Sequence, residues 1–505
     1  MYPKKRFVFF IVFLSFSSLF AQSITKGPYL AAPGKNSITI RWESDTKLSF
    51  TVKYGPAKSL SLKKQGELLG AKENHYLYEA HISQLIPGEN YFYQVTANAI
   101  KSGVQSFKCN LPQGEPVTFM VTGDSRSRPQ VFGRISEQVN QLDPDLIISV
   151  GDLVRQGGSY AQWGEYYFDA IGKSIDHIPL VAAIGDHEAD DIDGDAGVLF
   201  TYFLHPHMDH KKLWFSYDYG DAHFVALDYR YPDNREMIEW FKKDMEHSEA
   251  RWNFVYTHRP SYNVGGHRSA WGRTIWPVLF NDYKIDIVFA GHSHLYERFY
   301  PVRPQDDSAA WPVTYITSGG SGASLYDTGQ SPFLAFTQSI HHYMVIAING
   351  NHLDLGTYKI DGSLLDKISW KKNSKELESL VKPQDELDVY CMFTNAICKD
   401  LERLPMEDLP ATIKMDLKPV FCNEDIQFDI SLTKKSAKHY QMETVNGVIK
   451  GGQPLAVMLK IYAKGDMIVS EDGDIRPELR LQVNYKANSF TGYILGEDLE
   501  YKIYE

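Results

Sequence analysis

Five short segments of the chain place an acidic or histidine residue directly after an apolar run. Each run has four to six residues such as Val, Ile, Phe, Met or Ala, which is typical of a buried β-strand. The segments are FMVTGDSR, IISVGDLV, VAAIGDHE, FVYTHRP and IVFAGHSHLYER. In the same order, they contain Asp124, Asp152, Asp186 with His187, His258, and His292 with His294. Mixed carboxylate and imidazole ligands suit zinc, iron or manganese better than calcium. These residue types indicate hydrolytic chemistry at a centre of two metal ions.

The strands would bring these side chains together although they are far apart in the sequence. In open α/β sheets, ligands bind beyond the carboxyl ends of the strands, which is where each of these polar groups stands. Three carboxylates that lie close together would repel one another unless a cation lay between them. We therefore expect the three carboxylates and three or four of the imidazoles to converge on one edge of one sheet.

The bulk composition limits the classes of protein that fit. A chain of 505 residues is too long for one ordinary core, so we expect two or three domains. The formal net charge of −11 and the lack of a basic stripe argue against a nucleic-acid partner. The composition gives no indication of the oligomeric state.

The N-terminus has the pattern of a Sec-type signal peptide over residues 1–21. Lys4, Lys5 and Arg6 precede an apolar stretch of about 14 residues, Phe7 to Phe20. That stretch is shorter than the roughly 20 residues that span a bilayer. We expect cleavage and a soluble periplasmic or secreted protein that makes no membrane contact after cleavage.

Residues 25–112 have the pattern of an all-β sandwich. The segment SITIRWES alternates, which places Ile38, Ile40 and Trp42 on one face. The early tryptophan and the turn segment LIPGENYFY resemble a fibronectin type III module. We expect these aromatic residues to be core residues and not a ligand-binding surface.

Residues 115–360 alternate strand runs with helical stretches, which predicts a layered α/β domain. In REMIEWFKKDMEHSEA, for example, Ile238, Phe241 and Met245 have helical spacing, and the strand run WNFVYTH follows. This alternation predicts that the five metal-ligand segments belong to one domain.

The remainder of the chain contains a linking segment and a further β-rich domain. Residues 360–385 are charged and predict a linker or a linking helix. Residues 385–505 alternate again in TIKMDL, IQFDISL, AVMLKIYA and LRLQVNY, but no motif assigns this domain a role. Export would permit a disulfide bond between Cys391 and Cys398.

Taken together, these motifs resemble those of the calcineurin-like metallophosphoesterases. The N-terminal module makes the chain similar, more specifically, to the purple acid phosphatases. The resemblance runs from GPYL at residue 27 to about residue 360 and includes WFSYDYGDAHFVALD, HRPSY, GHSHLYER and TSGGSG. It implies an α/β metallophosphoesterase β-sandwich flanked by helices. It also implies hydrolysis of a small phosphorylated substrate by a metal-bound hydroxide, with Fe, Zn or Mn as the two divalent or trivalent ions.

The resemblance also implies individual roles for the metal ligands. The six implied ligands are Asp124, Asp152, Asp186, His258, His292 and His294. Asp124 and His294 would bind the first metal, and Asp152 would bridge both metals. The other three would bind the second metal, with Asp186 at the position where the family usually has Asn.

Four further residues are expected to act on the substrate. By resemblance, His187 would protonate the leaving oxygen and His267 would contact the phosphate. Arg155 replaces the tyrosine that colours the purple members through tyrosinate-to-ferric charge transfer. Arg126 replaces the histidine that the broader family has two residues after the first Asp. Because guanidinium groups match phosphate oxygens bidentately, we expect one or both arginines to bind the phosphate, the alternative being pairs with surface carboxylates.

Two other functions fit parts of the sequence. An incomplete first metal site between two β-sandwiches is also expected of a non-catalytic surface binding protein on a degenerate phosphatase scaffold. A GDSL-type serine esterase would use Ser125 with Asp244 and His247. The esterase hypothesis leaves the metal-ligand pattern unexplained.

Overall fold

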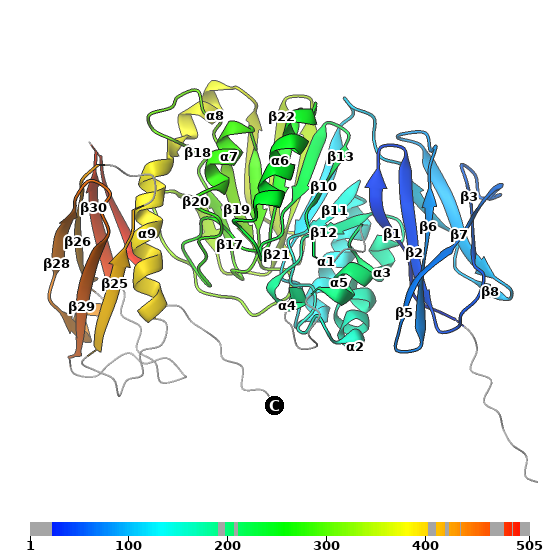
Figure 1. Cartoon of the computed structure of the whole chain (residues 1–505), viewed down its shortest axis with the longest axis horizontal. Helices are drawn as coiled ribbons and strands as arrows, with labels where there is room; N and C mark the ends of the chain where they lie inside the picture. Colours follow the sequence, from blue (N-terminus) through cyan, green and yellow to red (C-terminus); the bar gives the residue numbers. More distant parts are fainter. Residues whose placement is uncertain are drawn as a thin grey trace, which may run out of the picture.

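The structure, a computed structural model, describes residues 23–189, 197–206, 211–401, 411–419, 424–434, 436–464, 479–486 and 488–494. The predicted signal peptide lies outside these residues. The chain forms three units in a row, an N-terminal β-rich unit, a central α/β unit and a C-terminal β-rich unit (Figure 1). The predicted fold class, a layered α/β sandwich between β-rich units, is confirmed.

The N-terminal unit consists of two antiparallel sheets around a small aromatic core. One sheet contains, in order, β1 (Ile24–Gly34), β2 (Ser37–Ser44), β6 (His75–Ile82) and β5 (Glu67–Lys72). The other contains β4 (Leu62–Gln65), β3 (Thr51–Gly55), β7 (Asn90–Ala97), β8 (Ile100–Lys101) and β9 (Gln105–Lys108). Trp42 stacks on Tyr78 with 5.8 Å between ring centroids, and Tyr93 is fully buried. These aromatic side chains therefore belong to the core.

A buried polar cluster joins the N-terminal unit to the central unit. Alternation predicts one covered face for β2, but Arg41 and Glu43 on its other face are buried as well. Arg41 Nη1 donates to the backbone oxygen of His205 at 2.9 Å. Glu43 pairs with Lys26 at 2.6 Å and accepts a hydrogen bond from the Tyr160 hydroxyl. Because these groups satisfy one another, the second face of β2 can be buried without unpaired charges.

The central unit is a sandwich of two mixed sheets. The six-stranded sheet contains, in order, β12 (Leu180–Ala182), β11 (Leu146–Ser149), β10 (Val117–Thr122), β21 (His342–Asn349), β22 (His352–Lys359) and β23 (Leu364–Lys371). The seven-stranded sheet contains, in order, β13 (Phe215–Tyr219), β14 (Ala222–Ala226), β15 (Trp252–Tyr256), β16 (Ile287–Ala290), β19 (Thr314–Ser318), β17 (Tyr296–Phe299) and β20 (Leu334–Gln338). Phe119 of the first sheet contacts Phe224 and Phe254 of the second, at 5.0 and 5.1 Å between ring centroids. Aromatic packing thus fills the space between the sheets.

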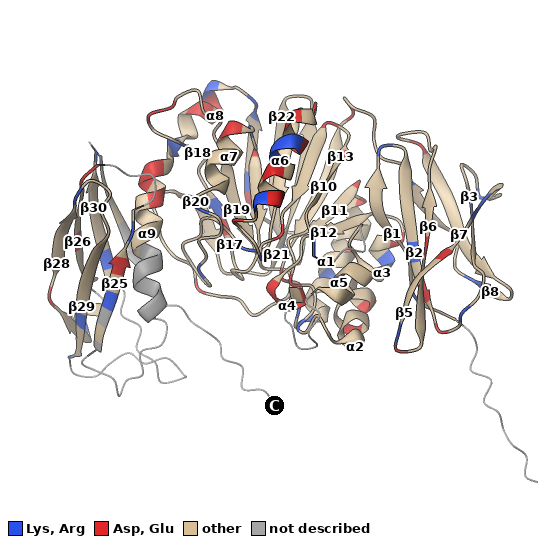
Figure 2. Cartoon of the chain, in the orientation of Figure 1, with Lys and Arg blue, Asp and Glu red and all other residues tan. Residues whose placement is uncertain are grey.

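Helices cover the outer faces of the sandwich. On the six-stranded side lie α1 (Pro129–Leu142), α2 (Tyr160–Gln162), the π-helix η1 (Trp163–Phe168), α3 (Asp169–Ile175), α4 (Asp186–Ala189) and α5 (Val198–Phe203). On the seven-stranded side lie α6 (Arg235–His247) and α7 (Trp276–Asp282). The predicted helix around Phe241 is α6, which begins where the Asn234 side chain accepts a hydrogen bond from Met237 N at 3.1 Å. It buries Met237, Phe241 and Met245 and shows acidic and basic residues on its outer side (Figure 2).

The segment expected to be a linker contributes a strand to the sandwich. Residues Leu364–Lys371 form β23, which pairs with β22 as an edge strand. The charged residues of this segment predicted a linker. They are compatible with a strand here because an edge strand can expose one face and its unpaired side to solvent. Helix α8 (Lys375–Leu380) and strand β24 (Lys382–Pro383) follow β23 in the sequence. Strand β24 pairs in parallel with the earlier strand β18 (Val302–Arg303).

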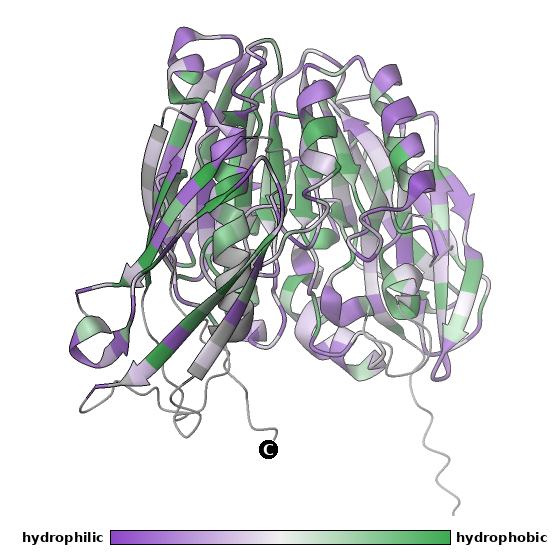
Figure 3. Cartoon of the chain, turned by 60° about the vertical axis from the view of Figure 1, so that its left-hand side comes forward, coloured by the Kyte–Doolittle hydropathy of each residue, from purple (hydrophilic) through white to green (hydrophobic). Residues whose placement is uncertain are grey.

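The C-terminal unit consists of one long helix and two small sheets. Helix α9 (Gln384–Leu401) precedes a sheet of β25 (Ala411–Leu417), β29 (Leu455–Ala463) and β27 (Tyr440–Met442). The other sheet contains, in order, β28 (Val445–Ile449), β26 (Ile426–Leu432), β30 (Leu479–Tyr485) and β31 (Asn488–Ile494), and a 3-10 turn, η3, covers Ser436–Lys438. The strands alternate hydrophobic and hydrophilic residues (Figure 3).

The C-terminal unit shares an apolar core with the central unit. One cluster of buried side chains includes Trp276 of α7, Tyr390 of α9 and Met415 of β25. The two cysteines for which export would permit a disulfide bond, Cys391 and Cys398, both belong to helix α9. Seven residues of helix separate their α-carbons by ~10 Å, which is too far for a disulfide.

Candidate metal centre

The predicted metal ligands follow strands that end at one edge of the sandwich. Strands β10, β11 and β12 run parallel to one another, as do β14, β15, β16 and β19. The residues that follow their carboxyl ends are Asp124, Asp152 and Asp186 on one sheet and His258, His292 and His294 on the other. The two sheets of the sandwich thus each supply one half of the site, whereas the sequence pattern suggested one edge of one sheet.

These six side chains form two groups that could each hold a metal ion. The first consists of Asp124, Asp152 and His294, and the second of Asp186, His258 and His292. Within each group, one ligand atom from every residue lies within 4.8 Å of the others. Because Asp152 Oδ1 lies 3.4 Å from His258 Nε2, Asp152 also reaches the second group. Asp152 is therefore placed between the groups, as a bridging carboxylate must be.

Three of the six residues adopt a left-handed backbone conformation. The φ angle is 55° at Asp124, 57° at Asp152 and 67° at His292. Such conformations are uncommon outside glycine and cost about 1–3 kcal/mol each. Strain of this kind clusters at functional sites, where it aims side chains that regular structure would point elsewhere.

The second group has the chemistry of a metal site. His258 Nδ1 donates to the backbone oxygen of Val150 at 2.9 Å, so in the neutral ring Nε2 carries the lone pair. That Nε2 is buried and makes no hydrogen bond to any of the residues that the structure describes. A buried nitrogen lone pair that faces Asp152 and Asp186 is satisfied by a cation, so these residues fit a metal ion. In the metal-free chain, burial lowers the pKa of His258, but the Asp152 and Asp186 carboxylates outweigh it and raise the pKa to about 9. Nε2 therefore carries a proton near neutral pH, which a metal ion would displace.

The first group is shared with an arginine. His294 Nδ1 donates to the backbone oxygen of Ser324 at 2.7 Å, and its Nε2 lies 3.4 Å from Asp124 Oδ1. Arg126 Nη2 lies 3.3 Å from the same Nε2, and Arg126 Nε donates to Asp152 Oδ2 at 3.2 Å. Arg126 is thus placed among the predicted ligands of the first metal.

The extra charge of Asp186 is matched by an arginine that the sequence interpretation missed. Arg259 donates from Nε and Nη2 to the two oxygens of Asp186, each at 2.9 Å. Its guanidinium lies 5.2 Å from the ring centroid of Tyr229, and that ring lies 5.6 Å from the ring of His258. An Asp–Arg pair therefore stands where the family usually has a neutral Asn. The signal available in the sequence was the arginine directly after His258.

Glu188 is a second residue that was missed. Its buried carboxylate accepts backbone hydrogen bonds from Asp152 (2.9 Å), Leu153 (2.8 Å), Val154 (3.2 Å) and Gly185 (3.0 Å). It therefore holds the loop that carries the bridging residue against the loop that carries Asp186. Its place two residues after Asp186 was the only signal, and it could not be distinguished from a surface acid.

The predicted substrate residues lie at different places. His187 is partly exposed beside the groups, with its Nδ1 donating to the backbone oxygen of Arg155 at 2.7 Å and its Nε2 at 3.8 Å from Asp152 Oδ2. The His267 ring lies 4.3 Å from that of His292. The Arg155 side chain makes no hydrogen bond or ion pair within the described part of the chain, so no contact places it at the site.

A pocket opens beside the second group. Its volume is about 590 Å³, and Arg259, His267, Trp271 and His292 are among the residues that line it. Cationic and aromatic walls next to the metal ligands suit a phosphate ester that carries a small organic group.

The serine esterase pairing is not formed. The carboxylate of Asp244 accepts from Ser216 at 2.7 Å and lies 2.9 Å from His223 Nε2. His247 is exposed, and its Nδ1 donates to the Lys243 backbone oxygen. Asp244 therefore does not orient His247 toward Ser125.

The layered fold and the two ligand groups are similar to what the motifs implied, a domain of the calcineurin-like phosphoesterase class. Residues 117–296 match the family model for calcineurin-like phosphoesterases. Among the residues that the structure describes, none of the helices combines the length and the apolar character that a bilayer crossing needs.

The similar proteins are, more particularly, purple acid phosphatases, as the motifs implied. Purple acid phosphatase 21 of Arabidopsis thaliana is 25% identical over 400 residues, which cover 73% of this chain and 86% of the relative. A probable inactive purple acid phosphatase 24 of the same plant is 23% identical over 385 residues, 60% of each chain. The structure of a purple acid phosphatase from yellow lupin seeds has a TM-score of 0.60 at 20% identity and covers 70% of this chain and 76% of that one. That last likeness concerns the fold.

Proposed function

We propose that this protein is an exported phosphatase that hydrolyses small phosphate esters at a centre of two metal ions. The observation that carries the proposal is the pair of ligand groups that meet at Asp152, with the buried His258 Nε2 3.4 Å from its carboxylate. The phosphoesterase domain and the purple acid phosphatase relatives support the same reaction class. Export rests on the predicted signal peptide over residues 1–21.

The ligand residues would hold the metals through carboxylate oxygens and imidazole nitrogens. Bound there, the metals would supply Lewis acidity that activates water and offsets the charge that develops on the phosphoryl group. Iron, zinc and manganese all suit this donor set. Val150 and Ser324, through their backbone oxygens, fix the tautomers of His258 and His294 so that Nε2 faces the metal.

His187 would act on the leaving group. The backbone oxygen of Arg155 holds its Nδ1 proton, and the ring is 28% exposed, so Nε2 is open to a bound substrate. When the ring is protonated, Nε2 can give its proton to the oxygen that departs from phosphorus. His267, next to His292 and within the pocket wall, would contact the phosphate.

The proposal is tested by assaying the purified full chain on a panel of phosphate monoesters and diesters while its metal content is measured. We expect turnover that is lost on chelation and restored by zinc, iron or manganese. Ser125→Ala is the matched control, because the serine esterase mechanism requires that hydroxyl and the metal mechanism does not. Turnover that survives chelation would contradict the proposal.

The alternative, a non-catalytic binding protein, is favoured by one observation. Arg126 occupies ligand atoms of the first group, and one relative is named probable inactive purple acid phosphatase 24. A chain that binds phosphate compounds but turns over no member of the panel with both metals loaded would support this alternative.

A further inference from the structure

We propose that the guanidinium of Arg126 competes with a metal ion for the first group, so that the second group fills first and more tightly. The inference rests on the metal-binding part of the proposed function and does not require catalysis. It concerns Arg126 alone, a residue that the family pattern does not place at this position.

Arg126 is held on the ligand atoms themselves. It lies on the same loop as Asp124, and its backbone N donates to the backbone oxygen of Asp152 at 3.1 Å. From there its Nε reaches Asp152 Oδ2 at 3.2 Å and its Nη2 reaches His294 Nε2 at 3.3 Å. The side chain therefore contacts two of the three residues of the first group.

The contact with His294 excludes simultaneous metal binding. A backbone oxygen can only accept, so the bond from His294 Nδ1 to Ser324 places the ring proton on Nδ1. Nε2 then has one lone pair, which faces the Arg126 N–H. That lone pair can bind a metal ion or accept from the guanidinium, but it cannot do both.

The second group makes the informative comparison. His258 Nδ1 donates to Val150 as His294 Nδ1 donates to Ser324, but His258 Nε2 lies 3.4 Å from the Asp152 carboxylate and no arginine of the described residues hydrogen-bonds to it. Arg259 does contact Asp186 in this group. A carboxylate oxygen has two lone pairs, however, so Asp186 can pair with Arg259 and still bind a metal. The other imidazole of this group also faces a carboxylate, because His292 Nδ1 lies 2.9 Å from Asp186 Oδ2. The two groups therefore differ in whether a permanent cation contacts an imidazole nitrogen.

Charge acts in the same direction. Asp124 and Asp152 are buried, and the Arg126 guanidinium offsets part of their negative charge in the metal-free chain. Guanidinium stays protonated in proteins, so a metal ion entering the first group must displace a permanent cation. Displacement costs the two contacts of Arg126, which lowers the affinity of the first group relative to that of the second.

The test is titration of the metal-free full chain with Mn²⁺, followed by calorimetry and by electron paramagnetic resonance. For the wild type we expect two classes of site that differ at least tenfold in Kd. At one equivalent we expect the signal of isolated Mn²⁺, with the signal of a coupled Mn²⁺ pair appearing only at higher ratios. In R126Q the weaker Kd should tighten at least tenfold, and the coupled pair should appear at lower ratios.

The matched control is R251Q, which removes an arginine that pairs with Asp221 away from both groups and should leave both Kd values unchanged. H294A should abolish the weaker binding event and H258A the stronger one, which assigns the two sites.

If R126Q does not fold, R126K must still tighten the weaker Kd, because an ammonium cannot donate from two nitrogens held at guanidinium spacing. Equal affinities in the wild type, or no tightening in either variant, would overturn the inference. Graded binding in a chain that hydrolyses nothing would keep this inference and refute only the proposed function.

Discussion

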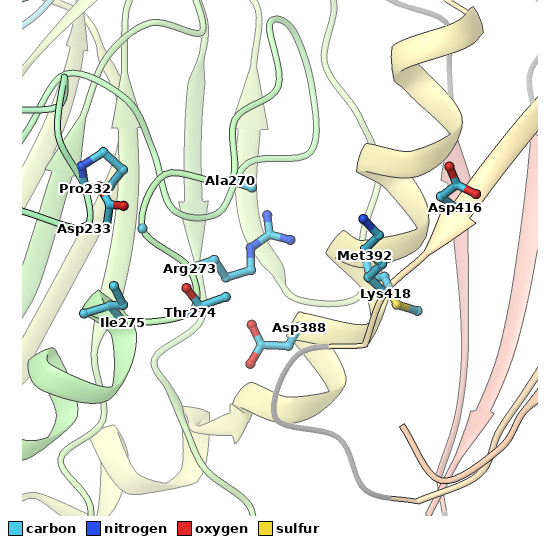
Figure 4. A pocket seen from close by; sticks show the side chains of 11 residues that line it. Pro232, Asp233, Ala270, Arg273, Thr274, Ile275, Asp388, Met392, Asp416 and Lys418 are labelled. Atoms are coloured by element: carbon cyan, nitrogen blue, oxygen red, sulfur yellow. The ribbon is translucent and has the colours of Figure 1, made fainter. Parts of the chain in front are cut away.

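The hydroxyl of Tyr262 donates a 2.7 Å hydrogen bond to Asp388 and thereby ties the loop after His258 to helix α9. Both residues are buried, and the guanidinium of Arg273 lies 5.3 Å from the Tyr262 ring centroid. Asp388 and Arg273 face a pocket of about 540 Å³ between the central and C-terminal units (Figure 4). The loop of Tyr262 continues to His267, so the C-terminal unit supports the substrate side of the site.

Replacing Asp388 should therefore destabilise the chain. Asp388→Leu leaves the buried Tyr262 hydroxyl without an acceptor, which costs about 1–3 kcal/mol. Asp388→Asn is the matched control, because its side-chain oxygen can still accept from Tyr262. Urea unfolding of both variants measures the difference. Equal stability of Asp388→Leu and the wild type would show that the hydrogen bond contributes nothing.

His187→Ala should lose more rate on alkyl phosphates than on p-nitrophenyl phosphate. A nitrophenolate leaves without a proton, whereas an alkoxide needs one, and help of this kind is worth ~10²–10⁴ in rate. Steady-state kinetics on both substrates measures the ratio. His267→Ala is the comparison, since a phosphate-contacting residue should lower both rates alike. An equal loss on both substrates for His187→Ala would assign that residue to phosphate binding.

The iron-loaded protein should not be purple. Arg155 stands where the purple members have tyrosine, and a guanidinium cannot become an anionic ligand. Tyr160 and Tyr262 cannot replace it where they stand, because their hydroxyls are bonded to Glu43 and Asp388. A visible spectrum of the iron-loaded, active protein checks this. A strong band that disappears in Tyr229→Phe, the tyrosine beside His258, would refute it.

His223 should make stability depend on pH above neutrality. Burial lowers its pKa, but hydrogen bonds with Asp218 and Asp244 outweigh burial and raise the pKa to about 9. The unfolded value is about 6.5. The contribution of His223 to stability is therefore fully present below pH 6.5 and is lost as pH rises through about 9.

Urea unfolding of the wild type and His223→Gln at several pH values measures that contribution. We expect the variant to be less stable by about 2–3 kcal/mol at pH 6, with the difference shrinking above pH 9. A difference that stays constant across this range would contradict the assigned cause.

The structure brings the six predicted ligand side chains together in two groups, but the sequence did not show what surrounds them. Asp124, Asp152 and His258 follow short apolar strands, and parallel strands must end at a common edge, so local pattern was sufficient. Arg259 and Glu188 could not be recognised, because their roles come from loops that are far apart in the sequence. The alternative of surface pairing for Arg126 was also incomplete, since its partner is the buried Asp152 and not a surface carboxylate.

The organisation of the C-terminal part was beyond reach for a related reason. Alternation identified strands such as β25 and β30, but it did not show that α9 and β25 pack into the same apolar cluster as α7. Periodicity reports which face of an element is buried and not which element covers it. The edge strand β23 was missed because its charged residues resemble a linker.

The most direct test of the central claim is the metal content and turnover of Asp152→Ala beside the wild type. Asp152 lies between the two ligand groups, so its removal unbalances both. Asp354→Ala, which removes a more exposed carboxylate on β22, is the control. We predict two metal ions and turnover in the wild type and in Asp354→Ala, and loss of both in a folded Asp152→Ala. Full turnover in Asp152→Ala would contradict the account.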